Sequence, residues 1–286
     1  MSADPASDGG PPERERPIGV FDSGVGGLTV VAALRRRLPH EEIVYLGDTA
    51  RLPYGTKSKE TVARYSQRTL DFLVARGVKA VVVACNTASA LALDRVRVDV
   101  PLIGVLEPGA RAASDACARG PIGVLATEST VRSGAYEEAI AAHRPGLDVI
   151  SCACPLFVPL VEEGWADDPI AVEIARRYLE PLLACRVDTL LLGCTHYPAL
   201  RATLRSVTGP NVRLVDSAET VAVQIEDDLA SRGLLRPPRA GAGAPPIHLH
   251  VTDAAERFGR IAHELLRSGG ALSAVAPPPS LALVDV

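Results

Sequence analysis

Aromatic residues and lysines are scarce in this chain. Phenylalanine, tyrosine and tryptophan make up 4% of its 286 residues, although hydrophobic residues of all kinds make up 47%. A core of valine, leucine and alanine with few rings is typical of parallel sheets covered by helices. Lysine occurs only at positions 57, 59 and 79, none of them in a context that predicts a Schiff-base pocket, which argues against pyridoxal phosphate.

A long apolar run and a strong excess of one charge are also absent. No segment reaches the roughly 20 apolar residues that span a bilayer, and residues 1–16 lack the apolar centre of a signal peptide. The formal net charge of −4 gives no sign of a nucleic-acid surface. We therefore expect a cytoplasmic protein with reduced thiols that binds no membrane and no nucleic acid directly.

The six cysteines form no C-x-x-C pair, so neither a zinc ribbon nor a thioredoxin-type motif is predicted. Cys152-x-Cys154 together with Cys194-x-His196 contains possible metal ligands, but the spacing does not match known zinc sites. We therefore expect no metal. The cysteines interpreted as structural or packing residues are Cys117, Cys152, Cys154 and Cys185.

Short apolar segments of the first half of the chain recur in the same order in the second half. Pro17-Ile18-Gly19-Val20 returns as Pro121-Ile122-Gly123-Val124, and a polar turn follows each. Strands are predicted at 17–20, 43–46, 80–84 and 101–105, and again at 121–124, 147–150, 189–193 and 212–216. Helices are predicted at 58–76, 170–184, 220–233 and 253–267. This order predicts an α/β fold of two similar domains, each a central parallel sheet flanked by helices and related by a pseudo-two-fold duplication.

The domain boundaries follow from the piece that has no counterpart in the first half. Residues 219–267, with a predicted strand at 248–251, have no equivalent after the first repeat, so we expect them to pack back on the first domain. The first domain is then 17–108 plus 219–267, and the second is 109–218. Residues 1–16 and 268–286 are rich in proline, glycine and small residues and are predicted to be disordered tails.

Two cysteines close equivalent buried strands of the two halves. Cys85 and Cys194 each follow a predicted strand and precede helix-starting residues. Ligands of open α/β sheets bind beyond the carboxyl ends of the strands, and the pKa of a thiol is lowered at a helix N-terminus. A site in the cleft between the domains, with one thiol on each side of a carbon centre, could remove a proton from one face and return another to the opposite face.

Other features of these turns leave alternatives open. His196 could exchange a proton with Cys194, and a Cys–His pair could instead serve hydrolysis, which would need one thiol rather than two. Glycines 24, 26 and 27 follow the first strand, but position 29 is threonine, so the G-x-G-x-x-G pattern of dinucleotide sites fails. Backbone amides of this turn are better suited to holding a carboxylate.

Seven segments carry a resemblance to a known family. They are 19–29 (GVFDSGVGGLT), 45–55 (YLGDTARLPYG), 84–89 (ACNTAS), 104–109 (GVLEPG), 130–136 (TVRSGAY), 154–162 (CPLFVPLVE) and 193–198 (GCTHYP). With these motifs in order, residues 18 to 267 resemble the glutamate racemases, the cofactor-independent branch of the aspartate/glutamate racemase family. Ala126 departs from the pattern, which more often has glycine there.

The resemblance implies that the protein interconverts L- and D-glutamate without a cofactor and supplies D-glutamate for peptidoglycan. It implies that Cys194 takes the proton from the L form and Cys85 from the D form, with Asp22, His196 and Glu162 tuning these thiols. The implied substrate contacts are Asp22, Ser23, Tyr54, Gly55, Asn86, Thr87, Thr130, Thr195 and His196.

The resemblance also implies partners and leaves the substrate open. A homodimer is expected, and because some glutamate racemases bind DNA gyrase, the basic, helical first domain could host such a contact. The nearest alternative activity is racemisation of aspartate or another amino acid. The thiols by themselves do not distinguish these substrates.

Overall fold

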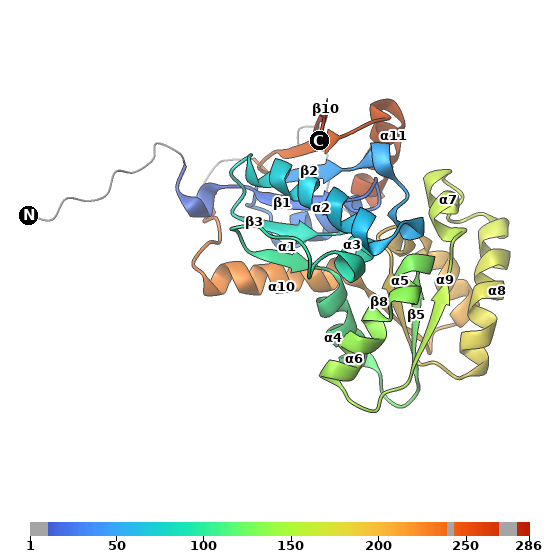
Figure 1. Cartoon of the computed structure of the whole chain (residues 1–286). Coiled ribbons are helices and arrows are strands. Elements are labelled where there is room, and N and C mark those ends of the chain that lie inside the picture. Colours follow the sequence, from blue (N-terminus) through green and yellow to red (C-terminus); the bar gives the residue numbers. More distant parts are fainter. Residues whose placement is uncertain (1–10, 239–242, 269–278) are drawn as a thin grey trace, which may run out of the picture.

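Two parallel β-sheets organise the residues that the computed structural model describes, 11–238, 243–268 and 279–286. The first sheet has the strand order β10-β9-β2-β1-β3-β4 and the second has the order β6-β5-β7-β8. Helices flank both sheets (Figure 1). The strands are β1 Ile18–Asp22, β2 Ile43–Gly47, β3 Ala80–Val83, β4 Leu102–Gly104, β5 Ile122–Ala126, β6 Val149–Ala153, β7 Thr189–Gly193, β8 Arg213–Asp216, β9 Ile247–Val251 and β10 Ser280–Leu283.

The predicted α/β fold with a duplicated parallel sheet is confirmed by strand order and register. The order β2-β1-β3-β4 of the first sheet matches β6-β5-β7-β8 of the second. Ile18 pairs with Ala80 in the first sheet, and Ile122 pairs with Thr189 in the second. Each cysteine of the predicted site lies five residues beyond the strand residue so paired, and the two thiols are therefore equivalent by register.

The helices agree in position with the sequence-based expectations and differ mainly at their ends. The predicted helices at 58–76, 170–184, 220–233 and 253–267 correspond to α2, α8, α10 and α11. Local signals explain their ends: Ser58 caps α2 through the amide of Thr61, and Asp168 caps α8 ahead of a first-turn proline. The helices are α1 Leu28–Arg37, α2 Lys59–Val74, α3 Asn86–Leu91, α4 Leu106–Ala116, α5 Glu128–Ser133, α6 Ala135–His143, α7 Phe157–Glu162, α8 Pro169–Ala184, α9 Arg201–Thr208, α10 Ser217–Ser231 and α11 Ala255–Ser268, with short 3-10 turns η1 Glu13–Glu15, η2 Thr49–Arg51, η3 Tyr54–Thr56 and η4 Tyr197–Leu200.

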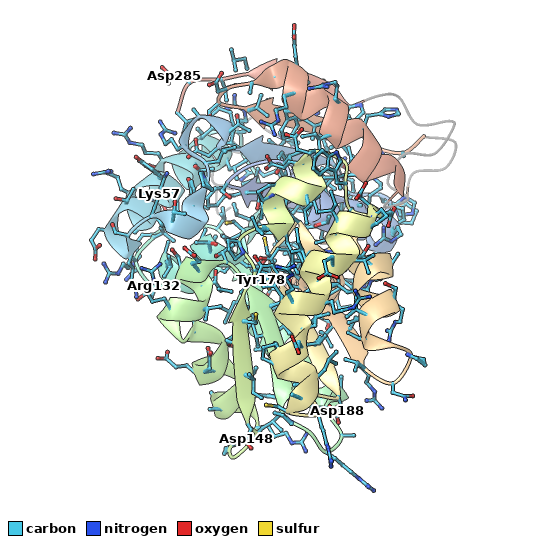
Figure 2. The ribbon with its side chains drawn as sticks, turned by 90° about the vertical axis from the view of Figure 1, so that its right-hand side faces the viewer. Lys57, Arg132, Asp148, Tyr178, Asp188 and Asp285 are labelled. Atoms are coloured by element: carbon cyan, nitrogen blue, oxygen red, sulfur yellow. The ribbon has the colours of Figure 1, made fainter. Side chains whose placement is uncertain are left out.

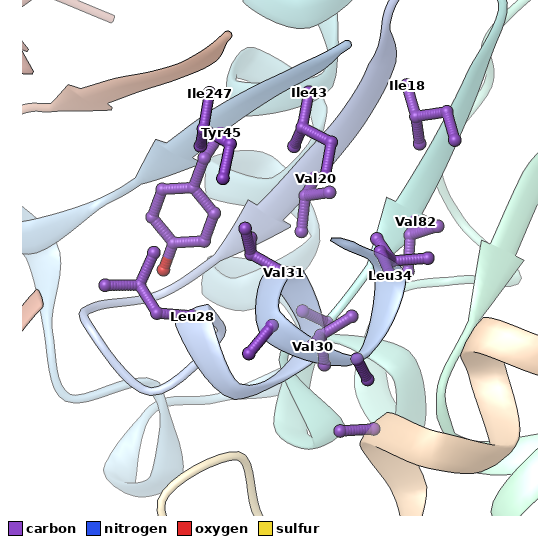
Figure 3. Close-up of a cluster of buried hydrophobic side chains, with 14 of the residues drawn as sticks. Ile18, Val20, Leu28, Val30, Val31, Leu34, Ile43, Tyr45, Val82 and Ile247 are labelled. Carbon is purple, nitrogen blue, oxygen red and sulfur yellow. The ribbon is translucent and has the colours of Figure 1, made fainter. Parts of the chain in front are cut away.

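The main core lies between the first sheet and the helices on one of its faces. Val31 and Leu34 of α1 point toward Val20 and Val82 of the central strands, and all four side chains are buried (Figure 3). Apolar side chains of α10 and α11 belong to the same cluster, although α10 directly follows the last strand of the second sheet. The chain thus returns to the first sheet after residue 216, whereas the boundaries at 108/109 and 218/219 stay a prediction.

The structure differs from the predicted disordered tails where it describes them. Residues 13–15 form η1, and the carbonyl of Arg14 accepts a bond from the buried Lys79 ammonium at 2.9 Å. Residues 280–283 form β10, which pairs in parallel with β9 because a short apolar segment completes the edge of the sheet. Residues 1–10 and 269–278 of the predicted tails lie outside the described residues. In the described ranges no helix has both the length and the apolar character needed to cross a bilayer.

Candidate active site

A cavity of about 360 Å³ lies where the carboxyl ends of the two sheets face each other. Asp148 and Asp188 directly precede β6 and β7. Figure 2 shows both residues at the end of the second sheet that lies away from the first sheet, so the carboxyl ends of β6 and β7 point toward the first sheet. The first half supplies residues 23–24, 52–56 and 85–87 to the lining. The second half supplies residues 127–128, 154–155, 158–159, 162–163 and 194–197, and α11 supplies Arg257.

Cys85 lies at the start of α3 and is held as a neutral thiol. Its sulfur accepts the amide of Ala88 at 3.4 Å, and its S–H donates to Ser23 Oγ at 3.4 Å. Burial and the nearby Asp22 carboxylate raise the pKa of Cys85 to about 12, because a thiolate there would lose water and face a negative charge. Hydrogen bonds that Ser23 and the Ala88 amide can donate to a thiolate oppose this shift in pKa without cancelling it.

Cys194 begins a short chain of proton-binding groups. Its sulfur lies 3.9 Å from His196 Nδ1, and His196 Nε2 lies 3.2 Å from Glu162 Oε1. Burial disfavours the charged imidazole, but contact with Cys194 and Glu162 outweighs it and raises the pKa of His196 to about 10. The bond to His196 lowers the pKa of Glu162 despite partial burial. His196 is therefore a cation that can hold or return a proton beside Cys194.

The two thiols thus have different neighbours although the strands that carry them are duplicated. Thr87 stands two residues after Cys85, where His196 stands two residues after Cys194. Asp22 and Ala126 both end the first strand of their sheets, so the carboxylate also has no counterpart in the second half. The alanine that departs from the family pattern therefore lies at the buried end of β5, paired with Gly193, and not at a thiol.

Asp22 is fully buried behind the cavity and is not one of its lining residues. The amide of Gly24 donates to Asp22 Oδ2 at 2.9 Å, and the Thr195 hydroxyl donates to Oδ1 at 3.4 Å. The amide of Gly24 thus holds the carboxylate of Asp22 itself, and the expectation that amides of this turn hold a bound carboxylate stays a prediction. Burial raises the pKa of Asp22, and the positive charge of His196 opposes the rise. Asp22 supports the turn and Thr195 rather than facing the cavity.

A cluster of three threonine hydroxyls supports another wall. Thr87 Oγ1 lies 3.0 Å from Thr127 Oγ1 and 3.2 Å from Thr130 Oγ1, and the latter two are 3.0 Å apart. Thr87 and Thr127 line the cavity, whereas Thr130 lies behind them. Sequence reasoning missed Thr127, although it follows β5 as Ser23 follows β1.

Asn86 presents an acceptor with no partner. Its Nδ2 donates to Tyr136 Oη at 2.7 Å and to Ser217 Oγ at 3.1 Å. Its Oδ1 is buried and has no hydrogen-bond partner among the described residues, while the residue lines the cavity. A buried unpaired oxygen is costly, so this atom can accept a proton donor such as an ammonium group.

Tyr54 is held in place by Asp48, which, like Thr127, the sequence analysis did not assign to the site. Its hydroxyl donates to Asp48 Oδ2 at 2.6 Å, and burial together with this carboxylate holds the pKa of Tyr54 well above its usual range. Asp48 also accepts bonds from Arg51 at 2.9 Å and from Thr252 at 3.0 Å. The sequence signal that could have assigned Asp48 to the site is its position directly after β2, among other polar residues.

Glycines let the two halves approach closely. A Cβ on Gly26 would lie 2.4 Å from Thr195 Oγ1 and 2.5 Å from His196 Nδ1. A Cβ on Gly55 would lie 2.9 Å from Thr127 Cβ, and the Gly55 carbonyl accepts the Ser129 hydroxyl at 2.6 Å. The site therefore depends on glycine at these positions for its geometry.

The predicted site residues are largely brought together. Two of them, Asp22 and Thr130, lie behind the lining. Those that line the cavity are Cys85, Cys194, His196, Glu162, Ser23, Tyr54, Gly55, Asn86, Thr87 and Thr195.

The other cysteines lie in different settings. Cys154, interpreted from the sequence as a packing residue at a strand end near the cleft, lines the cavity, and its sulfur lies 3.9 Å from that of Cys152. Cys117 and Cys185 are not among the lining residues. No group of three or more possible metal ligands occurs in the part of the chain that the structure describes.

Replacing Glu162 with glutamine is expected to lower the pKa of His196 from about 10 toward 6.5, its ordinary value, because a neutral amide no longer stabilises the imidazolium. A raised histidine pKa stabilises the folded state fully below pH 6.5, and this contribution is lost as the pH rises through about 10. The wild-type protein should therefore lose more stability than the variant over that pH range. NMR titration of the His196 ring and urea unfolding at several pH values measure both effects.

The matched control is Glu163→Gln, since Glu163 contacts Arg257 and not His196. We expect this control to leave the pKa of His196 unchanged. An unchanged pKa of His196 in Glu162→Gln would contradict the prediction.

Comparison with known proteins agrees with this geometry. The sequence profile of the family described as Asp/Glu/Hydantoin racemase matches residues 28–225. The chain is 49% identical over 260 residues to a glutamate racemase of Geobacter metallireducens, covering 90% of this chain and 94% of that protein. A glutamate racemase structure from Bacillus anthracis is similar with a TM-score of 0.87 and 37% identity, covering 96% of this chain and 98% of that one. One from Francisella tularensis, in complex with D-glutamate, is similar with a TM-score of 0.85 and 34% identity, covering 95% and 98%.

Proposed function

Because the chain belongs to the Asp/Glu/Hydantoin racemase family, we propose that it interconverts the L and D enantiomers of glutamate by proton transfer between two thiols. The observation that carries the proposal is that Cys85 from the first half and Cys194 from the second line one cavity. A single thiol would suffice for a hydrolase, whereas inversion at carbon uses a base on one face and an acid on the other.

In the L-to-D direction, Cys194 acts as thiolate and takes the α-proton, and its own S–H bond forms as the C–H bond breaks. Cys85 then donates its proton to the opposite face of the carbanion and is left as thiolate. The high pKa of the Cys85 thiol, about 12, suits it to be the proton donor at the start of this direction. The D-to-L direction runs these steps in reverse, with Cys85 as base.

Polar groups of the lining support the binding of an amino acid with two carboxylates. Asn86 lines the cavity, and a turn of its side chain would let the buried Oδ1, which has no partner among the described residues, accept a bond from the α-ammonium group. Hydroxyls of Ser23 and Thr87 would donate to carboxylate oxygens, whereas the Thr195 hydroxyl donates to Asp22. Such preorganised donors stabilise negative charge that develops on the substrate in the transition state, and a site enclosed between two halves excludes water.

The choice of glutamate rests on the relatives. The chain is similar to curated glutamate racemases at 46–49% identity, and the Francisella tularensis structure is in complex with D-glutamate. Racemisation assays with several amino acids test this choice. Activity on aspartate without activity on glutamate would favour the alternative substrate.

Racemisation of L-glutamate in deuterated water tests the two-thiol mechanism. We expect deuterium in the D-glutamate that forms and little deuterium in recovered L-glutamate at early times, because the proton removed stays on Cys194 while Cys85 supplies the other. Chiral separation followed by mass spectrometry measures both pools. Early and extensive exchange into L-glutamate would contradict the mechanism and indicate one base for both faces.

The wider role follows from the same resemblance. We propose that the D-glutamate supplies peptidoglycan synthesis in the cytoplasm and that the protein acts as a homodimer, with DNA gyrase as a further partner. A strain without this gene should grow only when D-glutamate is supplied.

Sedimentation measures the oligomeric state of the protein. Gyrase inhibition by a Cys85→Ser/Cys194→Ser variant would separate partner binding from racemisation.

A further inference from the structure

Arg257 lies on α11, which packs on the first sheet. Its side chain contacts two carboxylates, those of Glu162 and Glu163, in the part of the chain that surrounds the second sheet. Its Nη2 lies 3.3 Å from Glu162 Oε2 and 3.0 Å from Glu163 Oε1. The neighbouring Phe258 is buried in the core of the first sheet, so the backbone of α11 is fixed to that half. Glu162 ends α7 of the second half, and α7 and α11 lie on the same side of the molecule (Figure 1).

This arginine stands at the boundary of the cavity. Arg257, Glu162 and Glu163 all belong to the lining, yet the Arg257 side chain is 51% exposed. The ion pair therefore spans the two halves where the cavity meets solvent. A partly exposed ion pair is screened by salt and opens easily, which suits a contact that must break and form again during turnover.

The same arginine acts on the proton-binding groups through Glu162. One oxygen of Glu162 bonds His196 and the other bonds Arg257, so the arginine fixes the orientation of the carboxylate toward the imidazole. The charged or titratable groups that face His196 are Cys194, Asp22 and Glu162. The groups that face Glu162 are His196 and Arg257, and Arg257 also contacts Glu163.

We propose that Arg257 is a positioning residue that holds Glu162 toward His196 and, together with Glu163, closes the mouth of the cavity between the two halves. Substrate exchanges with solvent when this ion pair opens. The inference rests on the proposed function for its turnover measurements only, since closure of the mouth can be measured without a substrate.

The experiment compares Arg257→Gln, Arg257→Lys and Glu163→Gln with the unmodified protein. Iodoacetamide is the probe of an open mouth, and the alkylation rates of Cys85 and Cys194 are followed on separate tryptic peptides, residues 80–95 and 187–201. The rates are measured in the absence of substrate at low and high salt. KM and kcat for L- and D-glutamate are measured against pH.

Arg257→Gln is expected to raise both alkylation rates about two- to fivefold at low salt. This is about the factor by which the free energy of an exposed ion pair favours the closed mouth over the open one. The unmodified protein should approach these rates at high salt, whereas the variant should respond little to salt. The alkaline limb of the pH profile that follows His196 should move to lower pH, because a less ordered Glu162 stabilises the imidazolium less. Arg257→Lys keeps a positive charge at this position, so its alkylation rates and its pH profile should lie between those of Arg257→Gln and those of the unmodified protein. Glu163→Gln should raise alkylation without moving the pH profile, since Glu162 keeps its partner.

Arg260→Gln is the matched control, because it removes one positive charge from the exposed surface of the same helix and Arg260 is not a lining residue. Alkylation rates and a pH profile of Arg257→Gln equal to those of this control would overturn the proposal. Thermal unfolding of each variant shows whether it folds, and Glu163→Gln tests the mouth separately should Arg257→Gln fold poorly. Salt-sensitive alkylation in a protein that does not racemise glutamate would support closure while the proposed function fails.

Discussion

Replacing Cys194 with serine is expected to reduce kcat for racemisation of glutamate by about 10²- to 10⁴-fold in both directions, the range that a positioned acid or base contributes. A serine hydroxyl of the same shape fills the position beside His196 but does not ionise in this range of pH. Cys85→Ser should cause a loss of similar size, because inversion needs a group on each face. Chiral chromatography or coupled assays of both enantiomers measure the rates.

The controls for this prediction come from the chain itself. Cys117→Ser and Cys185→Ser remove thiols that do not line the cavity and should leave both rates near those of the unmodified protein. Circular dichroism and thermal unfolding show whether the site variants fold. Full activity in either Cys85→Ser or Cys194→Ser would mean that one thiol suffices, and the two-thiol mechanism would be wrong.

Gly26→Ala is expected to lower kcat/KM by about 10²-fold without unfolding the protein. The new methyl group would lie 2.4 Å from Thr195 Oγ1 and 2.5 Å from His196 Nδ1, so the turn after β7 must move away. Displacement of a catalytic group by about 1 Å costs on the order of 10²-fold in rate. The cores of the two sheets lie elsewhere, so thermal unfolding should change much less than activity.

A second glycine substitution separates this effect from a general effect of alanine. Gly243→Ala adds the same methyl group where no other atom lies within 4 Å, and we expect unchanged kinetics. Unchanged kinetics in Gly26→Ala itself would contradict the prediction, since the measured contact would then have relaxed without moving Thr195 or His196. NMR of the His196 ring in the variant reports such movement directly.

The sequence allowed prediction of the two sheets and of the two thiols, because both depend on local signals. Apolar runs of five residues followed by polar helix-starting residues mark strand ends wherever they occur, and their repetition gave the register that makes Cys85 and Cys194 equivalent. The resemblance then supplied the residues around them, most of which line one cavity.

Contacts between distant segments could not be predicted in this way. Arg257 and Glu162 are 95 positions apart, and nothing in the sequence around either residue indicates the other. Asp22 has the position expected from its strand, but its side chain faces the protein because the Gly24 amide and Thr195 bond it there. The strand at 280–283 has four residues and depends on the exposed edge of β9, which only the folded sheet provides.

The unequal surroundings of the two thiols have a thermodynamic consequence. L- and D-glutamate have equal free energies in water, so the equilibrium constant between them is unity and kcat/KM must be equal in the two directions. A cation beside Cys194 and a carboxylate beside Cys85 cannot bias the outcome of the reaction. The asymmetry can appear only as matched differences in kcat and KM, with the enantiomer that is held more tightly also turned over more slowly.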